Sequence, residues 1–274
     1  MDTLCGLFGK SKQAFYKHKH KTFSDSKTEE AILAIVDYYR QAMPSIGGLK
    51  LYGLVRDILG DAMDMGRDKF LALLHRKKWV VRPRKTHRTT HSNHLYFKYP
   101  NAVKGLDIKH INQVWASDIT YLYTIEDGFC YLHLVTDAFS RRIIGYSVSD
   151  TLEAKHTIEA LRMAIDNAGG GNLCGTIHHS DRGVQYCCSQ YVQMLTNHHI
   201  RISMTEDGNP TDNALAERVN GIIKGEFIDP YPTPKNLQEM TAMVEAAIRC
   251  YNTMRPHLSL GMQTPMQVYC GGTG

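Results

Sequence analysis

Residues 113–123, QVWASDITYLY, decide the fold of the longer part of this 274-residue chain. β-Branched and aromatic residues dominate the stretch, which is typical of a β-strand. Asp118 lies in its middle, on the side that carries Val114, Ala116 and Thr120, where burial normally excludes a charge. An acid at such a position indicates a compensated charge or a functional group.

Further strands and helices follow this stretch. After a turn at residues 126–128, residues 129–137 (FCYLHLVTD) are expected to pair back as a hairpin. The remaining pattern predicts strands at 142–149, 176–180 and 200–204, and helices at about 152–167, 189–199, 212–227 and 237–251. This order predicts an α/β core with a mixed five-stranded sheet flanked by helices.

The front of the chain has a different composition. Residues 1–110 contain 21 Lys+Arg and 10 Asp+Glu, a balance of +11, whereas residues 111–274 have a balance of −6. Apolar periodicity at about 29–39, 51–60 and 70–75 indicates three short helices, and therefore a small all-α helix-turn-helix domain.

A basic segment, RKKWVVRPRKTHR, continues from the third helix at residues 76–88, with seven basic residues in thirteen. We expect it to contact DNA phosphates, and the alternative is a solvated charged loop. The predicted DNA-binding residues here are Arg76, Lys77, Lys78, Arg82, Arg84 and Lys85.

These patterns predict four regions: an N-terminal tail or partial helix-turn-helix at 1–25, the helix-turn-helix domain at 26–86, a linker at 87–109 and a catalytic core at 110–270. No apolar run approaches the ~18 residues that a membrane span needs, and the N-terminus lacks a signal-peptide pattern. Seven cysteines without a CxxC pair favour a reducing compartment. A cytoplasmic, nucleoid-associated protein is expected.

Two more acids occupy suggestive positions. Asp181 directly follows the strand at 176–180, and open α/β sheets place ligand sites at the carboxyl ends of their strands. Glu217 lies on the helix at 212–227, and Asn213, Asn220 and Lys224 fall within ~60° of it around the helix axis. This polar stripe predicts contacts with DNA. Gaps of 62 and 35 residues separate Asp118, Asp181 and Glu217.

Three neighbouring carboxylates repel one another unless a cation neutralises them. Hard divalent ions such as Mg²⁺ prefer oxygen ligands, and two ions ~3.5–4 Å apart can assist the in-line displacement of a phosphoryl group. We therefore predict that Asp118, Asp181 and Glu217 are catalytic and bind two Mg²⁺ ions, which Mn²⁺ can replace. For each acid alone, the alternative is a cap or a surface charge.

Five ordered blocks also carry a family resemblance. They are WASDITYL (115–122), VTDAFSRRIIGYSVS (135–149), HSDRGVQY (179–186), DGNPTDNALAERVNGIIKGEF (207–227) and YNTMRPHLSLGMQTPMQVY (251–269). These blocks resemble the second-frame DDE transposases of bacterial insertion sequences that move by a copy-out, paste-in route, within the retroviral integrase superfamily. Residues 28–86 resemble the helix-turn-helix segment of the same family.

The resemblance implies a ribonuclease-H-like fold for about 110–270, Asp118, Asp181 and Glu217 as metal ligands, and Lys224 on a terminal DNA phosphate. It also implies cleavage by water at the terminal inverted repeats, then attack of the freed 3′ hydroxyl on target DNA. A dimer on paired ends is expected, with an upstream-frame helix-turn-helix partner or a frameshift fusion. The alternative function is a catalytically silent DNA-binding regulator of transposition. An RNA-strand hydrolase of the same fold is disfavoured by the helix-turn-helix segment.

Other polar residues receive more ordinary interpretations. Asp137 is predicted to act at a strand end or turn, and His178 and His179 to pack in the core. Arg255, followed by Pro256, presents its guanidinium from a rigid turn, either to a DNA phosphate or to an acidic residue of the same fold. The sequence leaves these two roles open.

Overall fold

The computed structural model describes residues 28–79, 96–206 and 213–271. The chain divides into two compact units, Met1–Val81 and Arg82–Gly274. The tail expected at residues 1–25 lies outside the described residues. Within the described part, no helix has the length and apolar character that crossing a membrane requires.

The first unit is helical, as the periodicity predicts. Its elements are a helix at 28–42, α3 at Gly48–Leu59, the short 3-10 helix η1 at Gly60–Ala62, and α4 at Arg67–Arg76. Their apolar faces form a small core that includes Ile32, Leu51 and Phe70, none of which is exposed. Gly48 allows α3 to approach α4 closely, because a Cβ atom there would lie 2.7 Å from Leu71 Cδ2.

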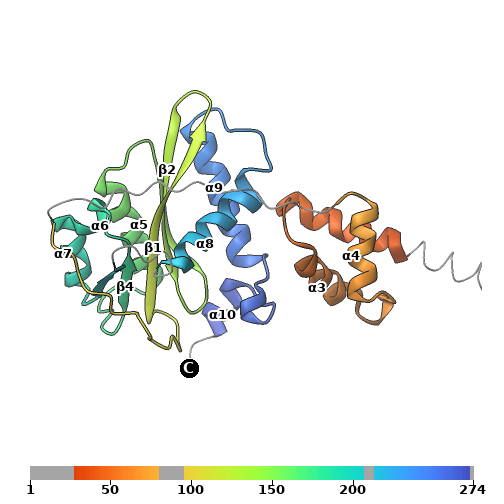
Figure 1. Cartoon of the computed structure of the whole chain (residues 1–274), viewed down its shortest axis with the longest axis horizontal. Coiled ribbons are helices and arrows are strands. Elements are labelled where there is room, and N and C mark those ends of the chain that lie inside the picture. Colours follow the sequence, from red (N-terminus) through yellow and green to blue (C-terminus); the bar gives the residue numbers. More distant parts are fainter. Residues whose placement is uncertain (1–27, 80–95, 207–212, 272–274) are drawn as a thin grey trace, which may run out of the picture. The chain divides into compact units, whose positions relative to one another are not determined.

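The second unit contains the predicted mixed sheet (Figure 1), with the strand order β3-β2-β1-β4-β5. The strands are β1 (Val114–Thr124), β2 (Gly128–Asp137), β3 (Ile143–Ser149), β4 (Ile177–Ser180) and β5 (Arg201–Met204). The first three pair antiparallel, whereas β4 and β5 run parallel to β1. Because β4 and β5 run parallel to β1, the carboxyl ends of all three strands lie at the same edge of the sheet.

Helices cover both faces of this sheet. They are α5 (Ala154–Asn167), α6 (Val184–Cys187), α7 (Ser189–Asn197), α8 (Ala214–Ile222), α9 (Leu237–Thr253) and α10 (Pro265–Gly271), with a π-helical segment η2 (Ile223–Ile228) and a 3-10 helix η3 (Leu258–Leu260). Figure 1 shows α5 on one side of β1 and β2, and α8 with α9 on the other.

The two faces are built from alternating residues of β1. Trp115 points into a core formed with Leu161 of α5 and Tyr191 of α7. Val114 points to the opposite face, where Leu215 of α8 packs against it. Asp118 has the same parity as Val114 and therefore lies on the face that α8 covers.

The structure differs from the predicted linker over residues 96–109. The Ala102 amide donates to Ser203 Oγ at 2.8 Å, and Val103 and Ile108 pack against a small buried cluster that contains Val114. This stretch is therefore part of the sheet unit. Its apolar residues have neither helical nor strand spacing, so periodicity gives no signal for their burial. The rest of the predicted linker, 87–95, lies outside the described residues.

Candidate active site

Asp118 and Asp181 come from adjacent parallel strands. Ala116 of β1 is opposite His179 of β4, and the same register two residues further along places Asp181 beside Asp118. Asp181 follows the last residue of β4, and both carboxylate-bearing residues are half-buried. The structure therefore brings together two acids that are 62 residues apart in the chain.

Helix α8 carries the third acid across the same face of the sheet. Asn213 Nδ2 donates to the Ser117 carbonyl oxygen at 3.0 Å, and Asn220 Nδ2 donates to Asp118 Oδ2 at 2.8 Å. These bonds attach the helix to β1 four residues before Glu217 and three residues after it. Glu217 itself is exposed and lies within electrostatic reach of Asp118.

Burial and the other two acids act on the ionisation of Asp118. Burial and, next, the negative charge of Asp181 raise the pKa of Asp118 to about 7, and Glu217 adds a smaller contribution in the same direction. The hydrogen bond from Asn220 opposes this rise but does not cancel it. A carboxyl group with this pKa is protonated about half of the time at neutral pH, unless a cation restores its charge.

The turn after β4 orients Asp181. The Gly183 amide donates to Asp181 Oδ1 at 2.9 Å, and a Cβ atom on Gly183 would lie 3.0 Å from the same oxygen. A side chain at position 183 would therefore crowd the carboxylate. Local backbone structure fixes this acid before any ligand binds.

The donor chemistry suits a hard divalent cation, because three carboxylates supply only oxygen ligands. Among the described residues, however, no three His, Cys, Asp or Glu side chains are close enough to hold a metal ion. The acids share an electrostatic neighbourhood but do not form a closed coordination shell. Binding an ion here requires their carboxylates to move closer together.

The structure corrects the predicted roles of Asn213 and Asn220. We expected both to face DNA on a polar stripe, yet their side chains are 7% and 4% exposed and bond to β1. The buried stripe of α8 contains Ala216 and Val219 together with Asn220. Helical-wheel reasoning assigned these amides to the exposed side because it counts every Asn as polar.

Lys224 lies beyond the end of the regular helix. It is half-buried and belongs to η2, where the Asp229 amide donates to the Lys224 carbonyl oxygen at 2.8 Å, in the wide π-type pattern. The prediction that Lys224 shares a face with Glu217 assumed an unbroken α-helix. Its contact with a DNA phosphate stays a prediction.

The predicted DNA contact of Arg255 is wrong. Its side chain is 3% exposed and binds both carboxylate oxygens of Glu226 at 2.7 Å, while one nitrogen lies 3.0 Å from His257 Nε2. Of the two roles that the sequence left open, the acidic partner within the fold is the correct one. A bidentate pair of this kind leaves the guanidinium no free edge for a phosphate.

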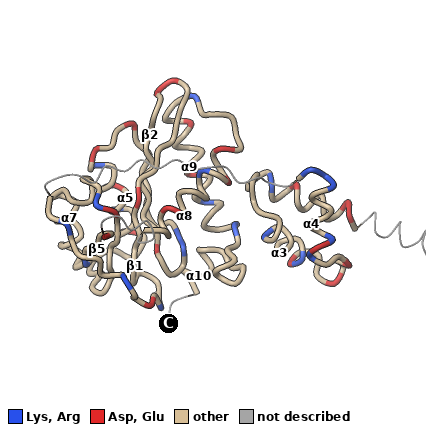
Figure 2. Tube along the Cα trace, viewed as in Figure 1, with Lys and Arg blue, Asp and Glu red and all other residues tan. Residues whose placement is uncertain are grey.

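Three of the predicted DNA-binding residues, Arg76, Lys77 and Lys78, lie at the end of α4, where Figure 2 marks several Lys and Arg positions. Arg76 bonds to both oxygens of Glu29, at 2.8 and 2.9 Å, and its side chain is 62% exposed. Lys77 and Lys78 are exposed. Arg82, Arg84 and Lys85 lie outside the described residues, so the predicted DNA contacts of the whole segment stay predictions.

The ordinary interpretations of three other residues are confirmed. Asp137 ends β2 with no exposed surface, and its carboxylate accepts from Ser140 Oγ at 2.6 Å and from the Asn112 amide at 2.7 Å. His178 is buried against Ser117 Oγ, and His179 bonds to Ser203 Oγ at 2.8 Å. None of the three points to a separate metal site.

Sequence comparisons place these features in a family. The family described as Integrase core domain matches residues 109–210, and a second family of the same description matches 198–265. The chain is 30% identical over 269 residues to the "Insertion element IS600 uncharacterized 31 kDa protein" of Shigella sonnei, covering 96% of both chains. It is 38% identical over 157 residues to transposase InsF of insertion sequence IS3A from Escherichia coli K12, covering 57% of this chain and 53% of the relative.

The fold and the sequence matches together define an integrase-core enzyme. The chain belongs to the DDE-type transposases of insertion sequences, within the retroviral integrase superfamily. Among solved structures, the integrase catalytic core domain of HTLV-2 in complex with magnesium is 22% identical, with a TM-score of 0.44 over 58% of this chain and 96% of that one. A chain of the simian T-cell lymphotropic virus intasome structure is 20% identical, with a TM-score of 0.49; the match covers 82% of this chain and 70% of that chain.

Proposed function

We propose that this transposase cleaves DNA at the terminal inverted repeats of an insertion sequence and joins the freed 3′ ends to target DNA. The observation that carries the proposal is the half-buried Asp118 with Asp181 and Glu217 nearby: burial first, and then the charges of these two acids, raise the pKa of Asp118 to about 7. Such a cluster costs stability unless it binds a cation, and natural sites retain such costs where function requires them.

In this proposal, Asp118, Asp181 and Glu217 hold two Mg²⁺ ions, for which Mn²⁺ can substitute. Ions bound there would activate the attacking oxygen and neutralise charge on the leaving oxygen. The chain itself orients the ligands: Asn220 holds Asp118 and the Gly183 amide holds Asp181. Both hydrogen bonds hold the two carboxylates in the orientation in which they face the proposed ion site.

The polar side chains of α8 then have a positioning role. Asn213 and Asn220 bind β1 on either side of Glu217, so they fix the height of the third acid above the sheet. Lys224 follows on η2, and we assign it to a phosphate near the cut end. DNA recognition is assigned to the basic segment at residues 76–88, through Arg76, Lys77 and Lys78 together with Arg82, Arg84 and Lys85.

A dimer on paired DNA ends would give each end its own acidic site. An upstream-frame helix-turn-helix partner, or a frameshift fusion with it, would add to the recognition of the ends. A cytoplasmic, nucleoid-associated location follows from these partners.

The test compares DNA joining with DNA binding in the full chain. Asp118→Asn, Asp181→Asn and Glu217→Gln are each expected to lower joining of terminal-repeat DNA in Mg²⁺ by roughly a thousandfold, the scale of losing a main electrostatic contributor. Binding to the same DNA is expected to change less than about twofold, because each change is small and lies within the acidic site. Asp166→Asn, an exposed acid on α5, is the matched control. Retained joining in any of the three variants contradicts the proposal.

The spacing of the acids favours one other candidate, a catalytically silent DNA-binding regulator of transposition. The described acids do not form a ready coordination site. This candidate predicts that the wild-type chain binds terminal-repeat DNA and leaves it uncut in Mn²⁺. Cutting in Mn²⁺ excludes it.

A further inference from the structure

A turn between β2 and β3 presents an arginine in an unusual conformation. Arg141 has a φ of +66°, in the left-handed region that favours glycine or asparagine. The conformation is fixed from two sides, because the Arg141 amide donates to the Asp137 carbonyl oxygen at 2.9 Å and the Tyr251 hydroxyl donates to the Arg141 carbonyl oxygen at 3.1 Å. A bulky residue held in this strain is a reason to look for a function of its side chain.

Helix α8 brings a second arginine to this turn. Leu215 packs against the cluster that contains Ala138, at the beginning of the turn. Arg218 follows Leu215 by three residues and therefore lies on the same side of the helix, next to Glu217 in the sequence. Burial lowers the pKa of Arg141. Tyr251 and Asp137 act to raise this pKa, whereas the positive charge of Arg218 acts to lower it.

Within the part of the chain that the structure describes, no carboxylate pairs with either of the two guanidinium groups. Among the described residues, neither Arg141 nor Arg218 forms an ion pair. Asp137, whose charge acts on Arg141, uses its oxygens for Ser140 and Asn112. Two like charges close together without a counterion form a site for an anion, and arginine forks match the geometry of a phosphate.

We propose that Arg141 and Arg218 together bind one backbone phosphate of the substrate DNA; this inference rests on the proposed function. The Ala138 amide donates to the Val114 carbonyl oxygen, so the turn lies at the beginning of β1. Asp118 is four residues further along, on the order of 13 Å at ~3.3 Å per residue. The bound phosphate then lies roughly four nucleotides from the cleaved bond, at ~3.4 Å per nucleotide along one strand.

The test measures the salt dependence of DNA binding. The full chain binds a duplex of unrelated sequence in EDTA, so that no cutting occurs, at KCl concentrations on either side of ~0.1 M. For the double variant R141G/R218A, we expect affinity to fall about tenfold and the slope of log K against log[KCl] to lose about one unit, as for one lost phosphate contact. R218K is expected to keep the wild-type slope, because it keeps the charge. R162A, which removes an exposed arginine from α5 on the opposite face of the sheet, is the control.

A second measurement separates binding from folding. R141G relieves the left-handed strain, so its melting temperature is expected to equal or exceed that of the wild type while its DNA affinity falls. An unchanged slope in the double variant, or a lower melting temperature in R141G with unchanged affinity, overturns the inference. Joining by the acid variants tests the proposed function separately. If those variants lose joining while the arginine variants keep the wild-type slope, only this inference fails.

Discussion

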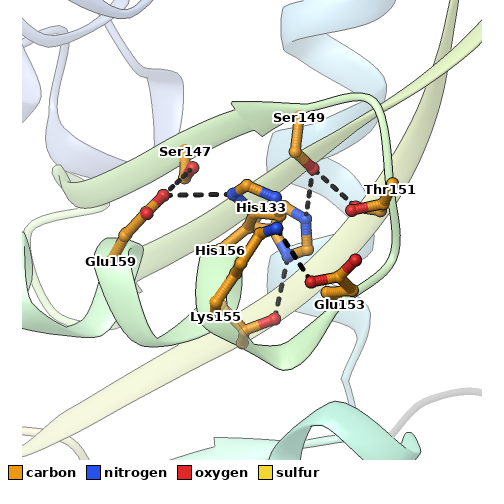
Figure 3. A network of polar contacts seen from close by, with 9 residues as sticks. His133, Ser147, Ser149, Thr151, Glu153, Lys155, His156 and Glu159 are labelled. Carbon is orange, nitrogen blue, oxygen red and sulfur yellow. Dashed lines mark hydrogen bonds and ion pairs between the residues drawn. The ribbon is translucent and has the colours of Figure 1, made fainter.

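Two clusters of polar side chains in the sheet unit follow opposite electrostatic rules. In the histidine network, made of His133, Ser149 and Thr157, both ring nitrogens of the buried His133 have partners (Figure 3): Thr157 Oγ1 at 2.9 Å and Ser149 Oγ at 3.1 Å. Burial, with the nearby His156, lowers the pKa of His133 to about 4. At the acidic site, by contrast, burial and a like charge raise the pKa of Asp118 to about 7.

The two clusters differ because the polar groups around His133 compensate for its burial, whereas those around Asp118 do not. His133 is neutral at physiological pH, and its hydrogen bonds compensate for the loss of water, so the network stabilises the fold. Asp118 accepts hydrogen bonds from Asn220 and from the Ile119 backbone, but burial and two repelling neighbours outweigh them, so its charge opposes the fold until a cation arrives. Substitutions in the two clusters are therefore expected to change stability in opposite directions.

The largest expected loss of stability concerns the buried ion pair of Arg255 and Glu226, a compensated contact like those of the histidine network. Arg255→Ala leaves the Glu226 carboxylate without its bidentate partner, and we expect it to lower the free energy of unfolding by about 3–5 kcal/mol. The double variant Arg255→Met/Glu226→Met removes both charges and is expected to recover most of this loss. Urea unfolding measures both effects. A loss below about 1 kcal/mol would place this pair among ordinary surface ion pairs.

The pH dependence of stability tests His133 directly. Its pKa rises from about 4 in the folded protein to the ~6.5 of an unfolded chain, so below pH 6.5 the unfolded state binds more protons. The titration of His133 therefore leaves the free energy of unfolding unchanged above pH ~6.5 and lowers it progressively as the pH falls to about 4. We expect the stability difference between wild type and His133→Gln to narrow by about 2–3 kcal/mol from pH 7 to pH 4.

His133→Gln is compared with the wild type at each pH, because other groups titrate over the same range in both proteins. His198→Gln is the matched control, since that histidine is only half-buried. A constant difference across the range would mean that His133 titrates normally in the folded protein.

Much of the fold was predictable because burial imposes regular spacing. The strands and helices of the sheet unit lie where period-two and period-3.6 patterns place them, and the pairing of Asp118 with Asp181 follows from two parallel strands that end at one edge. The buried side of α8 was not predictable from polarity. Asn220 is buried because Asp118, 102 residues earlier, accepts its hydrogen bond. Arg255 is likewise buried by Glu226, 29 residues away, and no local pattern records such pairs.

The smallest expected effect has the opposite sign. Asp118→Asn removes the charge that Asp181 and Glu217 repel and keeps a group of similar size beside Asn220. Without divalent ions at pH 8, we expect this variant to be about 1–2 kcal/mol more stable than the wild type, as at other functional sites that store strain. Mg²⁺ is expected to raise the melting temperature of the wild type and to leave that of the variant nearly unchanged, because the cation relieves the same repulsion. Asp166→Asn on the exposed side of α5 is expected to stay within about 0.5 kcal/mol of the wild type. If Asp118→Asn instead lowers stability in EDTA, the acidic site is a compensated structural cluster like the histidine network, and the contrast between the two disappears.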